Sequence, residues 1–340
     1  MRMRPRLGLV LLLGAAAVAA SLAFSCLTGA QPVTLSAAFA GQEPDRSILF
    51  GLRLPRALLG AVVGLALAAS GTALQALLRN PLAEPFVLGV SGGAALGGAL
   101  ALVAAALLGS VWAPLAALGH GSPVTAFAVG GAAGATVLVF AVGRIGGRLV
   151  PEAALLVGIV FNAFAAALIT ILKVLVPPEQ AARLLYWLMG TIGYEPPGTL
   201  LAAALVVAAA VGALVLLSAQ LNLLALGDEE AASLGVEVGR LRAVVLLAAS
   251  AATGAAVALS GMVGFVGLIV PHVVRRILGS DHRILVPASA LFGAAFLVVA
   301  DALARVAFLA LGSEPPVGAL TAFAGGPLFL WLLRRHEQRG

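Results

Sequence analysis

The chain has 340 residues, of which 61% are hydrophobic and only 10% are charged, and its mean hydropathy is +1.10. A soluble globular domain carries roughly 25% charged residues, so this composition excludes a water-soluble globular protein. The net charge of +6 comes from 20 basic and 14 acidic residues. The basic residues stand in short clusters between long apolar runs, which favours contact with anionic lipid headgroups over nucleic-acid binding. The single cysteine, Cys26, excludes an intramolecular disulfide framework and a paired-cysteine metal site.

The N-terminal segment begins with the basic stretch Met1 to Arg6, and an apolar run from Leu7 to Leu27 follows it. The apolar part of a signal peptide has about 7–15 residues, whereas about 20 residues cross a bilayer. This run is long enough to cross, and no small-residue cleavage site followed by a polar sequence comes after it. We therefore expect a first transmembrane helix.

Charge-free intervals mark the further membrane spans, because an unpaired charge in the middle of a bilayer is costly. Prolines and glycines divide the longest intervals, notably Pro114 and residues 119–123. At about 20 residues per crossing, the sequence predicts about ten transmembrane helices. They lie near residues 7–27, 57–79, 88–108, 123–143, 151–173, 198–218, 241–260, 265–279, 284–311 and 317–335. The predicted fold class is an all-α polytopic membrane protein with one transmembrane domain over residues 1–340.

The orientation follows from the basic residues. Ten spans put both termini on one side of the membrane, and that side then holds 14 of the 20 basic residues, against six on the other. Cytoplasmic loops carry the excess of Lys and Arg in membrane proteins. We therefore expect a multi-pass inner-membrane protein with both termini in the cytoplasm.

A weak internal repeat is also present. Five residues have identical counterparts 190 positions later: Gly64, Ser70, Gly71, Pro81 and Gly89 match Gly254, Ser260, Gly261, Pro271 and Gly279. The two copies would enter the membrane in opposite directions, as in transporters built from inverted repeats. Coincidence stays open as the alternative, because a chain with 41 glycines gives chance matches easily.

Polar residues concentrate around the end of the second predicted helix. Pro81 and Pro85 fix an irregular backbone there, which is tolerated near membrane depth only where protein or an aqueous cavity covers it. Close helix packing explains the neighbouring glycines. It does not explain Gln75, Asn80 and Glu84 beside them.

This segment resembles the hallmark of the FecCD/BtuC-type permeases, the membrane subunits of ABC importers of iron-siderophores, haem and cobalamin. The similarity covers about residues 50–335 and keeps the family's order. Its carriers are residues 52–94, 186–190, 226–235, 260–272, 281–283, 300–305, 314–318 and 326–327. The resemblance implies a BtuC-like type II importer fold, a homodimer with a second copy of the chain, two ABC ATPase subunits and a periplasmic substrate-binding protein. It implies no cofactor.

The resemblance also implies a docking site for the binding protein. In this family, outward-facing arginines pair with glutamates of the binding protein, and the matching residues are Arg53, Arg56 and Arg305. A guanidinium suits this role because its fork binds a carboxylate with two hydrogen bonds. The alternative is an arginine that anchors the chain at the membrane interface.

The resemblance also implies that short cytoplasmic helices between the sixth and seventh spans couple the chain to its ATPase, and these map to about residues 221–242. The central residues are Gly227, Asp228, Glu229, Glu230, Ala231, Ala232, Ser233, Leu234 and Gly235. The three acidic residues favour the start of a helix through the macrodipole, and the small residues would let that helix enter a groove on a partner. An ordinary solvated loop is the alternative.

The resemblance further implies a translocation path along the dimer axis, lined by the fifth helix. Its gates map to the start of that helix and to the turn after the second helix. The corresponding residues are Val150, Pro151 and Glu152, then Asn80 and Leu82. Asn162, Ala166 and Thr170 share one helix face and could line the path or pack against a helix. The first gate lacks the small hydroxyl residues of cobalamin importers, which puts that gate and that cargo in doubt.

Other chemistry finds little support in the sequence. No P-loop motif is present, so ATP hydrolysis belongs to a separate partner and the chain is not an enzyme. His272 and His282 lack companion ligands, so we expect no metal site. Asp301 and Arg305 are four residues apart and are expected to pair, with a proton-relay role for Asp301 as the alternative.

The predicted function is the permease subunit of an ATP-driven importer that moves a metal chelate from periplasm to cytoplasm. Ferric siderophore is the first expected cargo and haem or cobalamin the next, a ranking that comes from the resemblance alone. The rival class is an ion-coupled secondary transporter, which needs buried acidic groups in its helices and has only Asp301 as a candidate. An intramembrane enzyme would need a clustered nucleophile or metal set that the sequence does not show.

Overall fold

The computed structural model describes residues 3–29, 31–109, 123–145 and 148–337. The N-terminal half contains α1 (Met3–Leu27), α2 (Leu35–Phe39), the π-helical turn η1 (Ser47–Arg53), α3 (Leu54–Leu77), the 3₁₀ turn η2 (Pro85–Leu88), α4 (Val90–Leu108) and α6 (Pro123–Val142). A two-stranded antiparallel hairpin, β1 (Arg144–Ile145) and β2 (Arg148–Leu149), leads into α7 (Pro151–Val174). The remaining elements are α8 (Pro178–Leu188), α9 (Pro197–Leu216), α10 (Ser218–Leu224), α11 (Asp228–Ser233), α12 (Val238–Ser260), α13 (Val266–Leu278), α14 (His282–Leu311) and α15 (Val317–Glu337).

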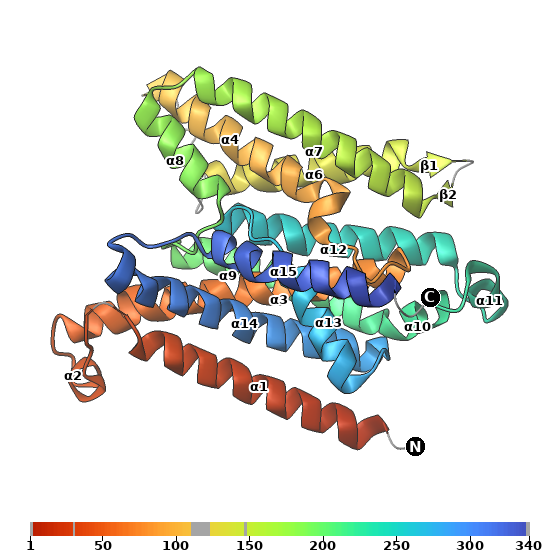
Figure 1. Ribbon diagram of the computed structural model, residues 1–340, viewed down its shortest axis with the longest axis horizontal. Helices are drawn as coiled ribbons and strands as arrows, with labels where there is room; N and C mark the ends of the chain where they lie inside the picture. Colours follow the sequence, from red (N-terminus) through yellow and green to blue (C-terminus); the bar gives the residue numbers. More distant parts are fainter. Residues whose placement is uncertain (1–2, 30, 110–122, 146–147, 338–340) are drawn as a thin grey trace.

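The long helices run side by side and form an elongated bundle (Figure 1). Within the described residues, eight helices are long and apolar enough to cross a membrane: α1, η1 with α3, α4, α6, α7, α9, α12 and α14. The two further predicted spans are also helical, as α13 and α15. The predicted all-α polytopic fold is therefore confirmed. Pro114 and residues 119–122, which the prediction used as breaks, lie outside the described residues.

The second predicted helix begins earlier than expected. We placed its start at residue 57 because Arg53 and Arg56 interrupt the apolar run. In the structure the helical run extends from Ser47 to Leu77. Both arginines bond to other parts of the chain, so their charges do not exclude them from the helix. The short helices α2 and α8 and the β1–β2 hairpin were not predicted.

Small residues let the central helices approach closely. A Cβ atom on Gly64 would lie 2.2 Å from the carbonyl oxygen of Gly293 in α14, and one on Gly71 would lie 2.0 Å from that of Gly267 in α13. Side chains would therefore force α3 away from both neighbours. Ser70 adds a hydrogen bond from its hydroxyl to the carbonyl of Ala249 in α12, at 3.2 Å. The core of the bundle is thus α3 enclosed by α12, α13 and α14.

The two ends of the bundle differ. The start of α1, the end of α15 and α11 lie at one end, which we call the α11 end, whereas α2 and α8 lie at the opposite end, called the α8 end (Figure 1). The internal repeat stays a prediction. Its matched residues differ in local structure, since Pro81 follows α3 whereas Pro271 lies inside α13.

Candidate functional site

The segment predicted to couple to an ATPase forms α11 at the α11 end of the bundle (Figure 1). Gly227 precedes it with a φ of +145°, a conformation that favours glycine. Within α11, Ala231 is fully buried. Six of the predicted coupling residues are exposed: Glu229, Glu230, Ala232, Ser233, Leu234 and Gly235. Leu226 and Leu234 also project into solvent, beyond the membrane-spanning helices. Exposed leucines beside acidic side chains form a surface suited to a protein partner.

Asp228 ties α11 to two other helices. Its carboxylate accepts hydrogen bonds from Arg79, which follows α3, and from Arg242 in α12, where Nη2 lies 2.9 Å from Oδ2. Arg79 also donates from Nε to the carbonyl of Leu224 at 3.0 Å. The side chains of Arg79 and Asp228 are 41% and 43% exposed. An exposed pair contributes only about 0.2–1 kcal/mol, so these contacts position α11 more than they stabilise the fold.

The turn after α3 contains the predicted gate residues Asn80 and Leu82. Arg79 adopts a φ of +47°, which ends the helix in the left-handed region. The side-chain oxygen of Asn80 then accepts a hydrogen bond from the backbone N–H of Leu82 at 2.9 Å, which stabilises the turn. Glu84 accepts a hydrogen bond from the backbone N–H of Phe265, just before α13. These polar residues fold the segment between α3 and η2, here called the gate turn (residues 79–84), and attach it to α13.

The fifth predicted span is α7, and it carries the remaining predicted path residues. They are Val150, Pro151 and Glu152 around its start and Asn162, Ala166 and Thr170 along it. Asn162 donates from Nδ2 to the carbonyl of Phe86 in η2 at 2.7 Å, so α7 is fastened to the segment that follows the gate turn. Ala166 and Thr170 are exposed, and the Thr170 hydroxyl donates to the carbonyl of Ala166 at 2.8 Å.

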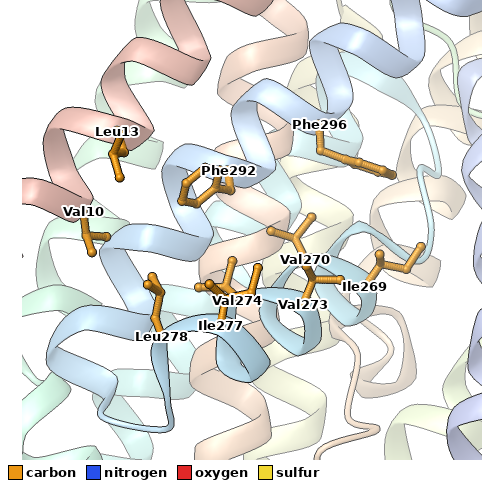
Figure 2. Close-up of a pocket in the computed structure, with 10 residues that line it drawn as sticks. All are labelled: Val10, Leu13, Ile269, Val270, Val273, Val274, Ile277, Leu278, Phe292 and Phe296. Atoms are coloured by element: carbon orange, nitrogen blue, oxygen red, sulfur yellow. The ribbon is translucent and has the colours of Figure 1, made fainter.

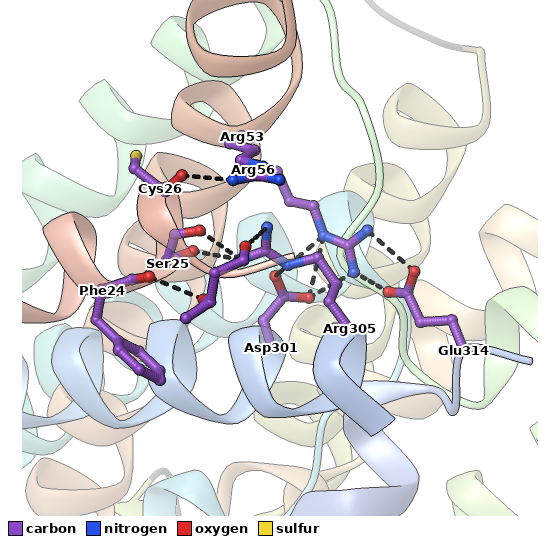
Figure 3. A network of polar contacts seen from close by, with 9 residues as sticks. Phe24, Ser25, Cys26, Arg53, Arg56, Asp301, Arg305 and Glu314 are labelled. Atoms are coloured by element: carbon purple, nitrogen blue, oxygen red, sulfur yellow. Dashed lines mark hydrogen bonds and ion pairs between the residues drawn. The ribbon is translucent and has the colours of Figure 1, made fainter. Parts of the chain in front are cut away.

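A polar network at the α8 end surrounds Asp301, which is only 1% exposed (Figure 3). Arg56 donates to its carboxylate from Nη2 at 2.7 Å and from Nε at 3.0 Å, and also pairs with Glu314. Arg305 lies with Nε 3.5 Å from Oδ2 of Asp301 and donates from Nη2 to the hydroxyl of Ser25 at 2.6 Å. The predicted pairing of Asp301 with Arg305 is confirmed, but Arg56 is the closer partner.

The three arginines predicted to dock a binding protein all belong to this network. Arg53 donates from Nη1 to the carbonyl of Cys26 at 2.9 Å (Figure 3). It also donates to the carbonyl of Gln31. Arg53 is 6% exposed and Arg305 is 9% exposed. Carbonyl groups around the end of α1 accept hydrogen bonds from Arg53 and Arg305, so both guanidinium groups are buried within this chain, and the docking role of the three arginines stays a prediction.

A family comparison decides the class of the protein. The model of the FecCD transport family matches residues 8–335. The chain belongs to the FecCD transport family.

Individual relatives agree with this membership in the FecCD family. The chain is 45% identical to the hemin transport system permease protein HmuU of Yersinia pestis, over 86% of this chain and 85% of that protein. It is 42% identical to the cobalamin import system permease protein BtuC of Halobacterium salinarum, over 88% and 77%. It is 37% identical to the Fe(3+)-citrate import system permease protein YfmD of Bacillus subtilis, over 86% and 82%.

A solved structure also matches this chain. It is an inward-facing metal-chelate type ABC transporter, with a TM-score of 0.81 and 29% identity over 96% of this chain and 99% of that chain. The resemblance seen in the sequence is therefore confirmed, and the chain is a membrane transport permease. The roles of the docking, coupling and gate residues stay predictions.

Sequence reasoning missed several residues that position these sites in the FecCD chain. Arg79 and Arg242 bond to Asp228, and Asn222 in α10 donates from Nδ2 to Asp281 at 2.7 Å. Asp281 caps α14 by accepting from the backbone N–H of Arg283. Each lies in a segment that the sequence analysis singled out, 52–94, 221–242 or 281–283, but nothing in the sequence indicates that these side chains bond to one another.

Asp281 also has an altered acidity. Hydrogen bonds from the Arg283 side chain and from Asn222, together with the Arg283 backbone N–H, lower its pKa to about 2, against the opposing effect of burial. The carboxylate is therefore charged throughout the physiological range. His282 beside it contacts the Asn222 side-chain oxygen through Nδ1 at 2.8 Å. Among the described residues, no cluster of three or more potential metal ligands is present.

Proposed function

We propose that this chain is the permease subunit of an ATP-driven importer that moves a metal chelate from periplasm to cytoplasm across the inner membrane. The observation that carries the proposal is the FecCD match over residues 8–335, almost the whole chain. The match includes every described element of the path, the coupling segment and the network at the α8 end. ATP hydrolysis is assigned to a separate partner.

The ATPase partner is proposed to bind at α11. This helix projects at the end of the bundle, and most of its predicted coupling residues are exposed. Asp228 connects it to Arg79, which begins the gate turn. If two ABC ATPase subunits move α11, the ion pair between Asp228 and Arg79 would transmit that movement to the gate turn.

The binding protein is proposed to dock at the α8 end, with both termini and α11 in the cytoplasm. Of the three candidate arginines, Arg56 keeps the largest exposed fraction, 22% of its side chain, and its partner Glu314 keeps 32%. We therefore propose that Arg56 makes the direct contact with a partner carboxylate. Arg53 and Arg305 support the backbone beneath it.

A second copy of the chain is proposed to cover α7. Only 11% of its apolar span is buried within the chain, the lowest share among the eight candidate spans. Leu156, Val160 and Phe164 project from it at four-residue spacing, and each is more than half exposed. A homodimer built on α7 would bring the predicted path residues Ala166 and Thr170 toward the dimer axis.

The cargo is proposed to be a metal chelate of the siderophore, haem or cobalamin type. The relatives described above are named for hemin, cobalamin and ferric citrate. The sequence ranking of ferric siderophore before haem and cobalamin stays a prediction, so all three chelates enter the test.

The test is uptake into proteoliposomes that contain this chain, its ATPase and its binding protein. Radiolabelled ferric siderophore, hemin and cobalamin are compared with and without ATP. We expect uptake of one chelate that requires ATP. Uptake that follows a proton gradient and ignores ATP would instead show an ion-coupled transporter.

A matched pair of variants tests the coupling surface. Leu234→Asp places a charge on an exposed apolar residue just after α11, where the fold does not depend on it. We expect it to reduce ATP-dependent uptake by about tenfold or more, as loss of an interface anchor does. Glu237→Gln changes an exposed residue that lies outside the central coupling residues 227–235 and should leave uptake unchanged.

A further inference from the structure

A cavity of about 250 Å³ that contains several polar side chains opens at the α11 end, between the gate turn, the end of α10, and α13 and α14. Its polar lining consists of Gln75, Arg79, Arg275 and His282. These four side chains come from three helices and the gate turn, so the cavity lies where the proposed coupling and gate elements meet. No carboxylate of the described residues lines it.

Arg275 carries a charge that the described part of the chain does not neutralise. Its only side-chain hydrogen bond there runs from Nη2 to the neutral oxygen Oε1 of Gln75, at 2.6 Å. The amide nitrogen of Gln75 donates to the carbonyl of Gly267 at 3.1 Å, which keeps Oε1 directed to the guanidinium. None of the ion pairs among the described residues includes Arg275.

Partial burial makes this unpaired charge costly. Arg275 lies in the last turn of α13, where the carbonyl ends of the helix offset part of the cost. A half-buried guanidinium with one neutral partner retains several N–H donors. These N–H donors, together with the cavity beside them, can bind an anion.

The surrounding charges increase this preference. The carboxylate of Asp228 is shared between Arg79 and Arg242. The carboxylate of Asp281, next to His282, is paired with Arg283. The two guanidinium groups that line the cavity are therefore those of Arg79, which already binds Asp228, and Arg275, which forms no ion pair within the described residues, so positive charge is in excess there.

We propose that this cavity binds a phosphate group, held by the guanidinium groups of Arg79 and Arg275. Guanidinium forks match the oxygen spacing of phosphate and bind it with paired hydrogen bonds. The phosphate has two chemical sources at this end of the chain: free inorganic phosphate and the headgroup of an anionic phospholipid. A bound phosphate would connect the gate turn to α13 directly beside α11. The proposal does not depend on transport, since binding is measured on the chain alone.

The first experiment titrates inorganic phosphate into the purified full-length protein in neutral detergent, with chloride at matched ionic strength as the reference. Binding is followed by ³¹P NMR line width and by the thermal unfolding midpoint, which a ligand of the native state raises. A second arm uses native mass spectrometry to count phosphatidylglycerol and phosphatidylcholine molecules retained by the protein. Phosphate binding identifies the free ion as a ligand, and selective retention of phosphatidylglycerol identifies the headgroup.

Variants at two adjacent arginines make the test specific. Arg275→Gln removes the charge and should weaken phosphate binding, or the retention of phosphatidylglycerol, by about tenfold or more, the usual effect of losing a charge-assisted hydrogen bond. Arg276→Gln alters the next residue, which is exposed and does not line the cavity, and should bind as the wild type does. Arg275→Lys keeps the charge but loses the fork, and should give an intermediate affinity.

Two results would overturn the proposal. One is a wild-type protein that shows no phosphate-specific signal and no preference for phosphatidylglycerol. The other is an Arg275→Gln variant that binds as tightly as the wild type. If Arg275→Gln does not fold, the wild-type titration and the comparison of Arg275→Lys with Arg276→Gln decide, because equal affinity in those two variants contradicts a guanidinium site.

Discussion

The polar networks at the two ends of the bundle use the same residue types but are built differently. At the α8 end, the central carboxylate of Asp301 is 1% exposed and binds Arg56 and Arg305 (Figure 3). At the α11 end, the side chain of Asp228 is 43% exposed and binds Arg79 and Arg242. Burial strengthens an ion pair's attraction but makes the loss of either partner expensive, whereas solvent weakens both effects. The first network can therefore hold the fold together, and the second can rearrange at low cost.

The elements that each network joins support this difference. Arg305 and Arg53 reach back to carbonyl groups near the end of α1, so the network at the α8 end fastens α1 to α3 and α14. The network at the α11 end joins the short helix α11 to the gate turn and to α12. One network connects long helices that define the bundle, and the other connects the short elements that are proposed to move.

The largest expected effect is the loss of the Asp301 carboxylate. Asp301→Asn preserves the side-chain shape but leaves the guanidinium groups of Arg56 and Arg305 with less negative charge in a buried site. Removing one partner of a buried pair typically costs about 3–5 kcal/mol. We expect a large fall in the thermal unfolding midpoint of the detergent-solubilised protein, measured by intrinsic fluorescence.

The control in the same network is Glu314→Gln. Glu314 also pairs with Arg56, but its side chain is 32% exposed. Its loss should cost no more than about 1 kcal/mol. Equal effects of Asp301→Asn and Glu314→Gln would contradict the view that burial distinguishes the two carboxylates.

A small stability effect and a clear functional effect are expected for Asp228→Asn. The variant weakens two partly exposed ion pairs, each worth about 0.2–1 kcal/mol, so the unfolding midpoint should change little. If Asp228 transmits the movement of α11 to the gate turn, uptake per ATP hydrolysed should fall severalfold. Both rates are measured in the same proteoliposomes.

A neighbouring acidic residue controls for charge. Glu229 is exposed and lies in the same turn of α11. Glu229→Gln should leave the ratio of uptake to ATP hydrolysis unchanged. A proportional decrease of uptake and hydrolysis in Asp228→Asn would mean that the residue serves ATPase binding rather than transmission.

The long helices could be predicted from the sequence because the length and position of each apolar run largely determine where a membrane-spanning helix lies. The prediction of 284–311 compares with α14 at His282–Leu311, and that of 151–173 compares with α7 at Pro151–Val174. The start of the second helix was predicted wrongly, because a charged residue was assumed to lie outside the buried part of a helix. Arg56 was used to begin a helix at residue 57, but its ion pair with Asp301 lets the helical run start at Ser47.

Pairs between distant parts of the chain could not be predicted. Arg56 and Asp301 are 245 residues apart, so one sequence gives no sign that they meet. The spacing of four residues between Asp301 and Arg305 did predict a contact, because neighbouring turns of a helix place such residues together. The same limit explains Arg53: the family resemblance selected the residue, but only the fold shows that its guanidinium group is buried.

The smallest expected effect concerns Asp281 and depends on pH. Hydrogen bonds in the folded protein lower its pKa to about 2 from an ordinary value of 3.8, so its charged form stabilises the fold fully above about pH 4. This stabilisation is lost as the pH falls from about 4 toward 2. Solvent screening keeps it below about 1 kcal/mol, since the paired side chains of Asp281 and Arg283 are 29% and 48% exposed.

The variant Asp281→Asn tests this contribution, because it retains a helix-capping side chain but not the charge. The unfolding midpoint of the wild type should therefore exceed that of the variant at pH 6, and the two should converge only below about pH 2. A constant difference across this range would show that the charge of Asp281 is not what stabilises the start of α14.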